Sequence, residues 1–245
     1  MGIQRIVALA ALFAVIGPAV PASAQLFPSL VDPSASPSDS LVTAPVQPSH
    51  VGLLGKRYLE ARYLHLRSDE SNGFDEAFHG FDVTFNSPIP WTDQLVPGLG
   101  TDVFVNGGFL RASDSIGGIS FELDAVGLEG GLTLHSVFGG PVRPFVQLGV
   151  DHTWTEIEAS FMGISATADD DQTEVLVRPG IEVDLASFIA MRTMLDIETD
   201  GDFDQSIASA ELIAWLSSNA YLRLGVFVPL EADSVGFAAG GGLSF

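Results

Sequence analysis

The chain has 245 residues, no cysteine and a formal net charge of −21, from 31 Asp and Glu against 10 Lys and Arg. The lack of cysteine excludes disulfides as a stabilising device. The acidic balance disfavours nucleic acid as a partner, because binding to phosphate requires basic patches. It also disfavours attraction of the whole chain to an anionic bilayer surface, so we expect cations as its counter-ions.

The N-terminal segment has the pattern of an export signal. Residues 1–5 form a short cationic start, residues 6–20 are mostly apolar, and the small residues up to Ala24 fit a cleavage site. The apolar run is short for a spanning helix, which needs about 20 residues. We therefore expect a signal peptide over 1–24, cleaved near Ala24, followed by a disordered tail rich in Pro and Ser over 25–54.

From residue 55 to residue 245 apolar and polar residues alternate with the period of β-strands, and helical periodicity is nearly absent. Many runs are longer than the 5–6 residues or so of an average soluble strand and match the ~9–11 residues of a tilted strand that crosses a membrane. Ten strands are expected, at 56–67, 79–86, 101–112, 118–136, 143–160, 172–185, 188–199, 207–217, 219–230 and 235–245.

The connections between these strands alternate in character. One set is short, as at 186–187 and 217–219, and the other is polar and acidic, as at 165–171 and 199–204. Membrane barrels have short turns on one side and longer loops on the other. The connection 86–100 breaks this rule, because it is long and contains three prolines. It is either a short plug or a mis-assigned strand, which leaves eight strands as the alternative to ten.

Most strands have one apolar face and one face with charges. In a closed barrel within a membrane, the apolar face meets lipid and the charged face fills the lumen. The strand 118–136 changes phase near residues 126–128, which predicts a β-bulge there. The alternation assigns to a lumen charge network Glu60, Arg62, Glu122, Asp124, Arg178, Glu182, Arg192, Asp196, Glu211 and Arg223.

The last ten residues, GFAAGGGLSF, carry a resemblance to a known family. Phe237 and Leu243 lie on one face of an alternating strand that ends on Phe245. Such a strand resembles the C-terminal assembly signal of bacterial outer-membrane β-barrels, and the chain is similar in architecture to the small OmpA/OmpX-like barrels. The resemblance implies an all-β fold, a closed antiparallel up-and-down transmembrane barrel. It also implies a monomer in the bacterial outer membrane with its tail in the periplasm, and the membrane lipid and the barrel-assembly machinery as partners.

Four functions remain open on these residues. A structural or interaction role in the cell envelope, with acidic loops turned outward, is favoured because small barrels fill their lumen with side chains. The alternative is a narrow, cation-preferring, porin-like channel. An outer-membrane hydrolase would use His79, which lies near Asp75 and Glu76, but no nucleophile–base spacing is present, so we expect neither an enzyme nor a cofactor. The fourth possibility is a secreted, soluble β-protein.

The acidic loops contain one weak candidate for a metal site. Asp200, Asp202 and Asp204 have the spacing of the start of a calcium loop, but the downstream bidentate Glu is missing. Divalent cations held there would bridge the loop to lipid head groups. A solvated loop is the simpler interpretation.

Overall fold

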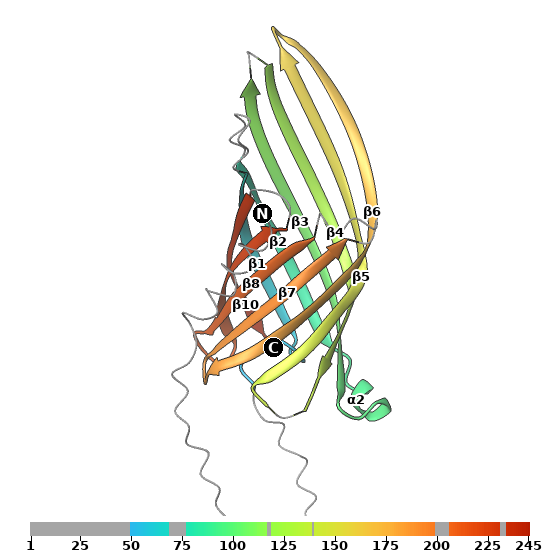
Figure 1. The fold of residues 1–245 in the computed structure, drawn as a ribbon, viewed down its shortest axis with the longest axis vertical. Helices are drawn as coiled ribbons and strands as arrows, with labels where there is room; N and C mark the ends of the chain where they lie inside the picture. The colour runs from blue at the N-terminus through green and yellow to red at the C-terminus, as the bar shows by residue number, and fades with distance from the viewer. Residues whose placement is uncertain (1–49, 69–76, 117–118, 139, 199–205, 231–233) are drawn as a thin grey trace, which may run out of the picture. The chain divides into compact units, whose positions relative to one another are not determined.

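The computed structural model describes residues 50–68, 77–116, 119–138, 140–198, 206–230 and 234–245. Within them, ten antiparallel strands form a closed barrel in which each strand pairs with the next and the first pairs with the last (Figure 1). This confirms the all-β closed barrel and the ten-strand count, and it excludes the eight-strand alternative.

The ten strands follow one another around the barrel in the order of the sequence. Their bounds are β1 Tyr58–Ser68, β2 Ala77–Pro88, β3 Leu99–Ile116, β4 Ile119–Ser136, β5 Val142–Phe161, β6 Ile164–Ala186, β7 Ile189–Glu198, β8 Ile207–Trp215, β9 Ala220–Pro229 and β10 Ser234–Ser244. One short helix, α2, spans Thr92–Leu95. Among the described residues, no helix has both the length and the apolar character needed to cross a bilayer.

The barrel has two unlike ends. At the end where β1 begins and β10 stops, here called the terminal end, three of the four connections are short, and the fourth, between β2 and β3, is long. At the opposite loop end, β3 to β6 continue beyond their neighbours, because the described pairing of β3 with β2 stops at Ala112 and that of β6 with β7 begins at Leu176. We call this four-stranded continuation the extended sheet (Figure 1).

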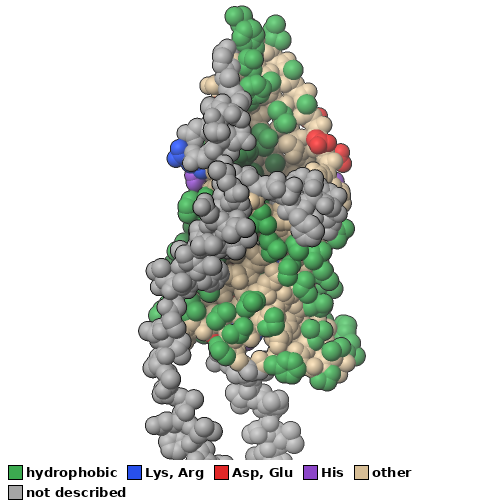
Figure 2. All heavy atoms as spheres, viewed as in Figure 1, with side chains coloured by type: hydrophobic (Ala, Val, Ile, Leu, Met, Phe, Trp, Pro, Cys, Tyr) green, Lys and Arg blue, Asp and Glu red, His purple; other side chains and the backbone are tan. Residues whose placement is uncertain are grey.

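The wall of the barrel is apolar outside and polar inside. On β9, Leu222 and Leu224 are about half exposed on the outward face, while Arg223 between them is buried in the lumen. Apolar side chains cover much of the wall visible in Figure 2. This is the reverse of a water-soluble barrel, whose apolar face is its core, and it is the arrangement of a barrel surrounded by lipid.

The predicted β-bulge in the fourth strand is wrong. β4 pairs with β3 and with β5 in unbroken register along its whole length. Without a bulge, successive side chains keep alternating between the two faces. Phe121 and Leu123 therefore share the lumen-side face with Glu129, while Glu122 and Asp124 share the outward face with Leu128. In the extended sheet the two faces have exchanged their polarity.

The long connection at 86–100 is neither a plug nor a misplaced strand. β2 runs to Pro88 and β3 begins at Leu99, so both expected strands exist, and α2 lies in the loop between them at the terminal end (Figure 1). Trp91 and Leu95 in this loop are exposed by 56% and 69%. The loop is on the outside of the barrel.

A different segment fills the terminal end of the lumen. Residues 50–57, here called the N-terminal plug, precede β1, and Leu53 and Leu54 within it are 0% and 2% exposed. The compact unit that contains the barrel begins at Ser49. The last residues of the expected tail, 50–54, thus belong to the barrel.

Candidate functional site

The plug binds the lumen wall through its backbone. Four successive amides, those of Gly52, Leu53, Leu54 and Gly55, donate hydrogen bonds to carboxylate oxygens of three residues of the wall. The donor–acceptor distances are 3.2 Å to Asp184, 3.0 and 3.4 Å to the two oxygens of Glu182, and 2.9 Å to Asp102. Charge-assisted hydrogen bonds of this kind are stronger than neutral ones. The segment is therefore held by carboxylates of β3 and β6.

Each of the two glycines of the plug is favoured at its position for a different structural reason. Gly55 has a φ of +73°, in the left-handed region that favours glycine. Gly52 has ordinary dihedrals but lies against Glu182, where an added Cβ would be 1.8 Å from Oε1 of that carboxylate. Both glycines let the backbone approach the wall closely enough for its amides to bind.

Glu182 is the centre of the charge cluster at this level. It is fully buried and pairs with Arg192 at 2.7 Å and with Arg143 at 3.2 Å, while Asp184 pairs with Arg143 at 2.5 Å. Two guanidinium groups and the amides of the plug thus surround one carboxylate. Buried ions require this degree of pairing, because removing one partner leaves an uncompensated charge.

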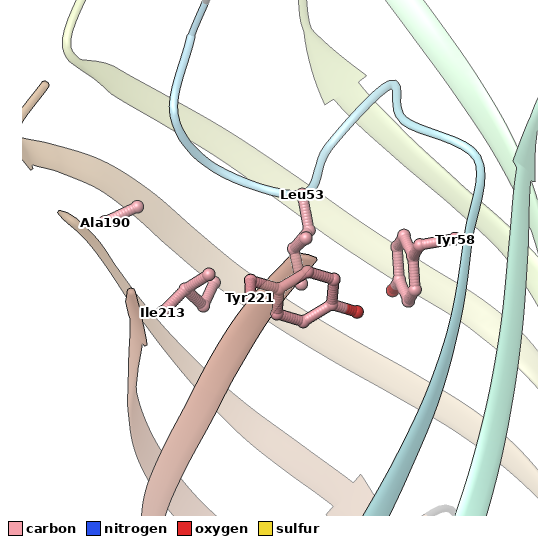
Figure 3. Packing of buried hydrophobic residues seen from close by; sticks show 5 residues of the cluster. All are labelled: Leu53, Tyr58, Ala190, Ile213 and Tyr221. Carbon is pink, nitrogen blue, oxygen red and sulfur yellow. The ribbon is translucent and has the colours of Figure 1, made fainter. Parts of the chain in front are cut away.

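A small apolar core closes the other side of the plug. The side chain of Leu53 is directed from the plug toward Tyr221 and lies among residues of β1, β7, β8 and β9 (Figure 3). Tyr58 and Tyr221 meet edge to face at 6.1 Å. Trp215 donates from its indole nitrogen to the carbonyl oxygen of Val51, and the Lys56 ammonium lies 4.1 Å from the centre of its ring. The plug is therefore held on its apolar side as well.

His50 and Lys56 face the same charges from the plug. Burial, together with the nearby positive charges of Arg143 and Lys56, lowers the pKa of His50 to about 4. Burial also lowers the pKa of Lys56, against the opposing pull of Glu182 and Asp184. The seated plug thus favours an uncharged imidazole at neutral pH.

A second charge cluster spans β1, β2, β8 and β9 farther along the lumen. Arg223 donates to Glu60 at 2.7 Å and also to Glu211. Arg62 donates to Glu211 at 3.0 Å and to Asp82 at 3.0 and 2.5 Å. The pairs form one chain of alternating charge across the interior.

A third cluster joins β4, β6 and β7. Arg178 on β6 donates to Glu129 on β4 and, at 2.6 Å, to Asp196 on β7. His135 and Asp102 are buried nearer the plug, with the Nε2 of His135 3.3 Å from the carboxylate. All five arginines that face the lumen are paired with carboxylates.

The structure brings together eight of the ten residues assigned to the lumen network from the sequence. The exceptions are Glu122 and Asp124, whose assignment is wrong. They lie on the outward face and pair with Arg111 at 3.1 and 2.6 Å, because β4 lacks the bulge that would have turned them inward. Sequence reasoning missed Arg143, although it falls on the charged parity of its strand.

Other expected residues have simpler surroundings. His79 lies on the outward face beside Tyr63 and His65, whereas Asp75 and Glu76 fall outside the described residues. Within the described residues, no group of three or more His, Asp or Glu is placed to hold a metal ion. The weak metal candidates Asp200, Asp202 and Asp204 also lie outside that part of the chain.

The C-terminal residues of the expected assembly signal lie on the outside of β10 and just after it. Phe237, Leu243 and Phe245 are all more than half exposed. Their side chains therefore face the surroundings of the barrel, where another molecule can contact them. Their role as an assembly signal stays a prediction.

The extended sheet carries a shallow groove near its tip. The groove has a volume of about 450 Å³ and is lined by Ser113, Asp114, Ser115, Ser120, Phe121, Glu122, Glu158 and Ser160. Glu122 and Glu158 are directly opposite each other on β4 and β5. Like charges in this position repel, so the pair costs stability.

These features define a membrane-type β-barrel with a filled lumen, and the comparisons agree on the fold. No family model and no curated protein sequence matches the chain. The transport unit of the autotransporter AIDA-I from Escherichia coli matches with a TM-score of 0.50 and 8% identity, over 78% of this chain and 90% of that one.

Two further solved structures are similar over the same share of the chain. The β domain of the Bordetella autotransporter BrkA has a TM-score of 0.49 and 14% identity over 78% of this chain and 100% of that one. Ail, the attachment invasion locus protein of Yersinia pestis, has a TM-score of 0.36 and 13% identity over 78% and 99%. The likeness to the AIDA-I transport unit, with its TM-score of 0.50, is one of fold alone.

Proposed function

We propose that this protein is an outer-membrane barrel with a closed lumen, which acts in the cell envelope through its outward surface. The observation that carries the proposal is the seated N-terminal plug, whose amides bind the carboxylates of Glu182, Asp184 and Asp102. A barrel blocked in this way does not conduct solutes through its lumen. Its function is therefore structural or depends on the molecules that its outer surface contacts.

The proposed membrane location is supported by the barrel wall and by the sequence that precedes the first strand. An apolar outer face and an ionic lumen suit strands that cross hydrocarbon, because closure of the barrel satisfies every backbone hydrogen bond internally. The expected export signal over 1–24 and the strand up to Phe245 favour the same placement. Three of the four connections at the terminal end are short, so the proposal places this end of the barrel in the periplasm.

The closed lumen also fits the size of the barrel. Wide aqueous channels occur at about 16 strands, whereas barrels of about 8 strands are filled by side chains. Here three Arg–carboxylate clusters and the plug occupy the interior of ten strands. A narrow cation-preferring channel is the competing function, and it requires the plug to leave.

The outward surface of the proposed role is the extended sheet. Its outward face is polar, with Glu122, Asp124, Glu156 and Glu158 in neighbouring positions of β4 and β5. Its position at the loop end directs it away from the periplasm. A partner that binds there would be polar or cationic, by charge complementarity.

Planar-bilayer recordings of the mature protein test the proposal. We expect a silent bilayer, and steady single-channel steps from the intact protein would contradict the closed lumen. A variant that lacks residues 25–57 is the matched comparison, and it should conduct if the plug is the block. Migration on gels before and after boiling, with fractionation of the cell envelope, tests the membrane location separately.

A further inference from the structure

The cations of this acidic chain are distributed unevenly over the barrel. Of the nine Lys and Arg after residue 50, Lys56 and Arg57 precede β1 at the terminal end. Five more are paired in the lumen, namely Arg62, Arg143, Arg178, Arg192 and Arg223. The remaining two, Arg67 and Arg111, lie on the outward face near the loop end.

Two histidines lie between these arginines. His65 is directly opposite His79 in the β1–β2 pairing, and His79 is directly opposite Arg111 in the β2–β3 pairing. Arg67 follows His65 on the same face of β1. We call these four residues the basic row; they occupy adjoining positions of three neighbouring strands.

The imidazoles are held in place by hydrogen bonds. Nδ1 of His79 is 2.5 Å from the Tyr63 hydroxyl and 3.2 Å from Nδ1 of His65. The shorter contact is satisfied when the Tyr63 hydroxyl donates to the single lone pair of Nδ1 of His79. The proton of His79 is then on Nε2, which leaves that nitrogen as a hydrogen-bond donor for another molecule.

The height of the basic row on the wall places it at the lipid head groups. Tyr63, Phe81 and Phe109 are opposite one another two residues closer to the terminal end, on the same outward face. Aromatic residues gather at the membrane–water interface of such barrels. The Arg111 guanidinium lies 5.9 Å from the centre of the Phe109 ring, directly beyond this aromatic row.

The wall formed by the next three strands is acidic. The line of residues that contains His79 and Arg111 continues across β4, β5 and β6 as Asp124, Glu156 and Asp169. Figure 2 shows basic and histidine side chains at one edge of the view and carboxylates at the other. The chain therefore has a local basic surface although its net charge is strongly negative.

Arg111 keeps donor capacity despite its own carboxylates. Its Nε and Nη2 donate to Asp124 at 2.6 Å each, and Nη2 lies 3.1 Å from Glu122. The Nη1 nitrogen is used in none of these contacts. A guanidinium has five N–H donors in a planar fork, so a further anion can be bound at the free side.

We propose that the basic row binds the phosphate of an anionic lipid head group in the leaflet at the loop end. Arg67 and Arg111 supply the charge, and the imidazoles supply hydrogen-bond donors between them. A divalent metal held by the two histidines is the competing occupant, and the flanking guanidinium groups oppose it. This inference rests on the proposed membrane location.

The test compares two lipids on the purified full-length protein in a neutral detergent. Native mass spectrometry counts bound phosphatidylglycerol and bound phosphatidylcholine during titration. We expect a preference for phosphatidylglycerol that falls about tenfold, or about 1.4 kcal/mol, in the double variant Arg111→Gln, His79→Gln, because the variant loses one guanidinium group and one imidazole donor. Binding of phosphatidylcholine should not change.

His152→Gln is the matched control, because His152 is also on the barrel wall, on β5, and makes one side-chain hydrogen bond, to Thr173. It should keep the preference. Equal retention of phosphatidylglycerol by the double variant would overturn the proposal. So would Zn²⁺ binding that requires His79 without any lipid preference. A protein that shifts on boiling but prefers neither lipid refutes the head-group site alone, whereas failure to enter vesicles refutes the membrane location.

Discussion

The amide of Leu53 donates a 3.0 Å hydrogen bond to Glu182, a residue 129 positions later in the chain. This bond joins the segment before the first strand to the wall of the sixth. Glu182 at the same time compensates the charges of Arg143 and Arg192. Closure of the lumen and stability of the barrel therefore depend on the same carboxylate.

Substitution of Gly52 by Val should unseat the plug. Its Cβ would lie 1.8 Å from the Glu182 carboxylate, closer than any real contact, and the buried carboxylate is held by two arginines. The chain has no cysteine, so a Leu54→Cys variant gives a single thiol whose reaction with a water-soluble maleimide reports the plug. We expect labelling to become at least tenfold faster.

Gly140→Val provides the control for this experiment, because a Cβ at Gly140 meets nothing within 4 Å. Labelling of Leu54→Cys should be as slow in this background as in the parent. An unchanged rate in the Gly52→Val background would contradict the account of the plug.

Glu182→Gln should strongly destabilise the barrel. Removing one partner of a buried ion pair costs about 3–5 kcal/mol, because the guanidinium groups left behind are uncompensated. Urea unfolding in detergent or lipid measures the change in the free energy of unfolding. Glu122→Gln, which removes an exposed carboxylate paired with Arg111, should cost less than about 1 kcal/mol. A similar loss of unfolding free energy in both variants would refute the conclusion that the buried carboxylate of Glu182 stabilises the barrel more than the exposed carboxylate of Glu122.

Acidification should release the plug. The pKa of His50 is about 4 in the seated state, below its ordinary value of 6.5, so the released state binds the proton more readily. The contribution of neutral His50 to the stability of the bound plug is complete above about pH 6.5 and is lost as the pH falls toward 4. Labelling of Leu54→Cys, divided by that of an exposed Ser217→Cys variant, should rise at pH 5.

His50→Gln separates this effect from others that titrate in the same range. The variant should label at nearly the same normalised rate at pH 5 and pH 7. A rise as large as that of the parent would show that another group controls the plug.

Phe245→Ala should reduce assembly into the membrane, as expected for a terminal aromatic on the outward side of the last strand. The amount of heat-modifiable barrel in the envelope measures assembly. Phe138→Ala is the matched control, because Phe138 is similarly exposed, at 71% against 67%, but lies in a turn. Equal assembly of both variants would remove the assembly role from Phe245.

The strands and their closure were predictable because alternation depends only on the order of residues along the chain. Ten runs were expected and ten strands are present, and the charged parity identified Glu60, Glu182 and Arg223 as lumen residues. The physical reason is simple: lipid outside and an ionic interior impose the same two-residue period on every strand.

The same rule failed where its environment ends. In the proposed membrane location, the outward face beyond the aromatic row meets polar head groups and water instead of hydrocarbon, so Glu122 and Asp124 can point outward although they are charged. The predicted bulge required a single environment along the whole of this strand. A change of phase without a bulge is a signal that a strand leaves the bilayer.

The plug was missed for a different reason. Residues 50–57 bind mainly through backbone amides, which do not depend on the type of side chain. The pattern of side chains in the sequence therefore does not reveal the groups that bind. The two glycines, Gly52 and Gly55, were the available signal. Their spacing is too common to predict a binding segment without the carboxylates that receive it.

The acceptors of the plug have a consequence for the order of assembly. Asp102 is on β3, Glu182 and Asp184 are on β6, and Trp215 is on β8, so the first described residues of the chain are bound by strands that follow much later in the sequence. The plug therefore has no complete binding site until these strands have joined the wall. Sealing is therefore a late event, and an incomplete barrel stays open.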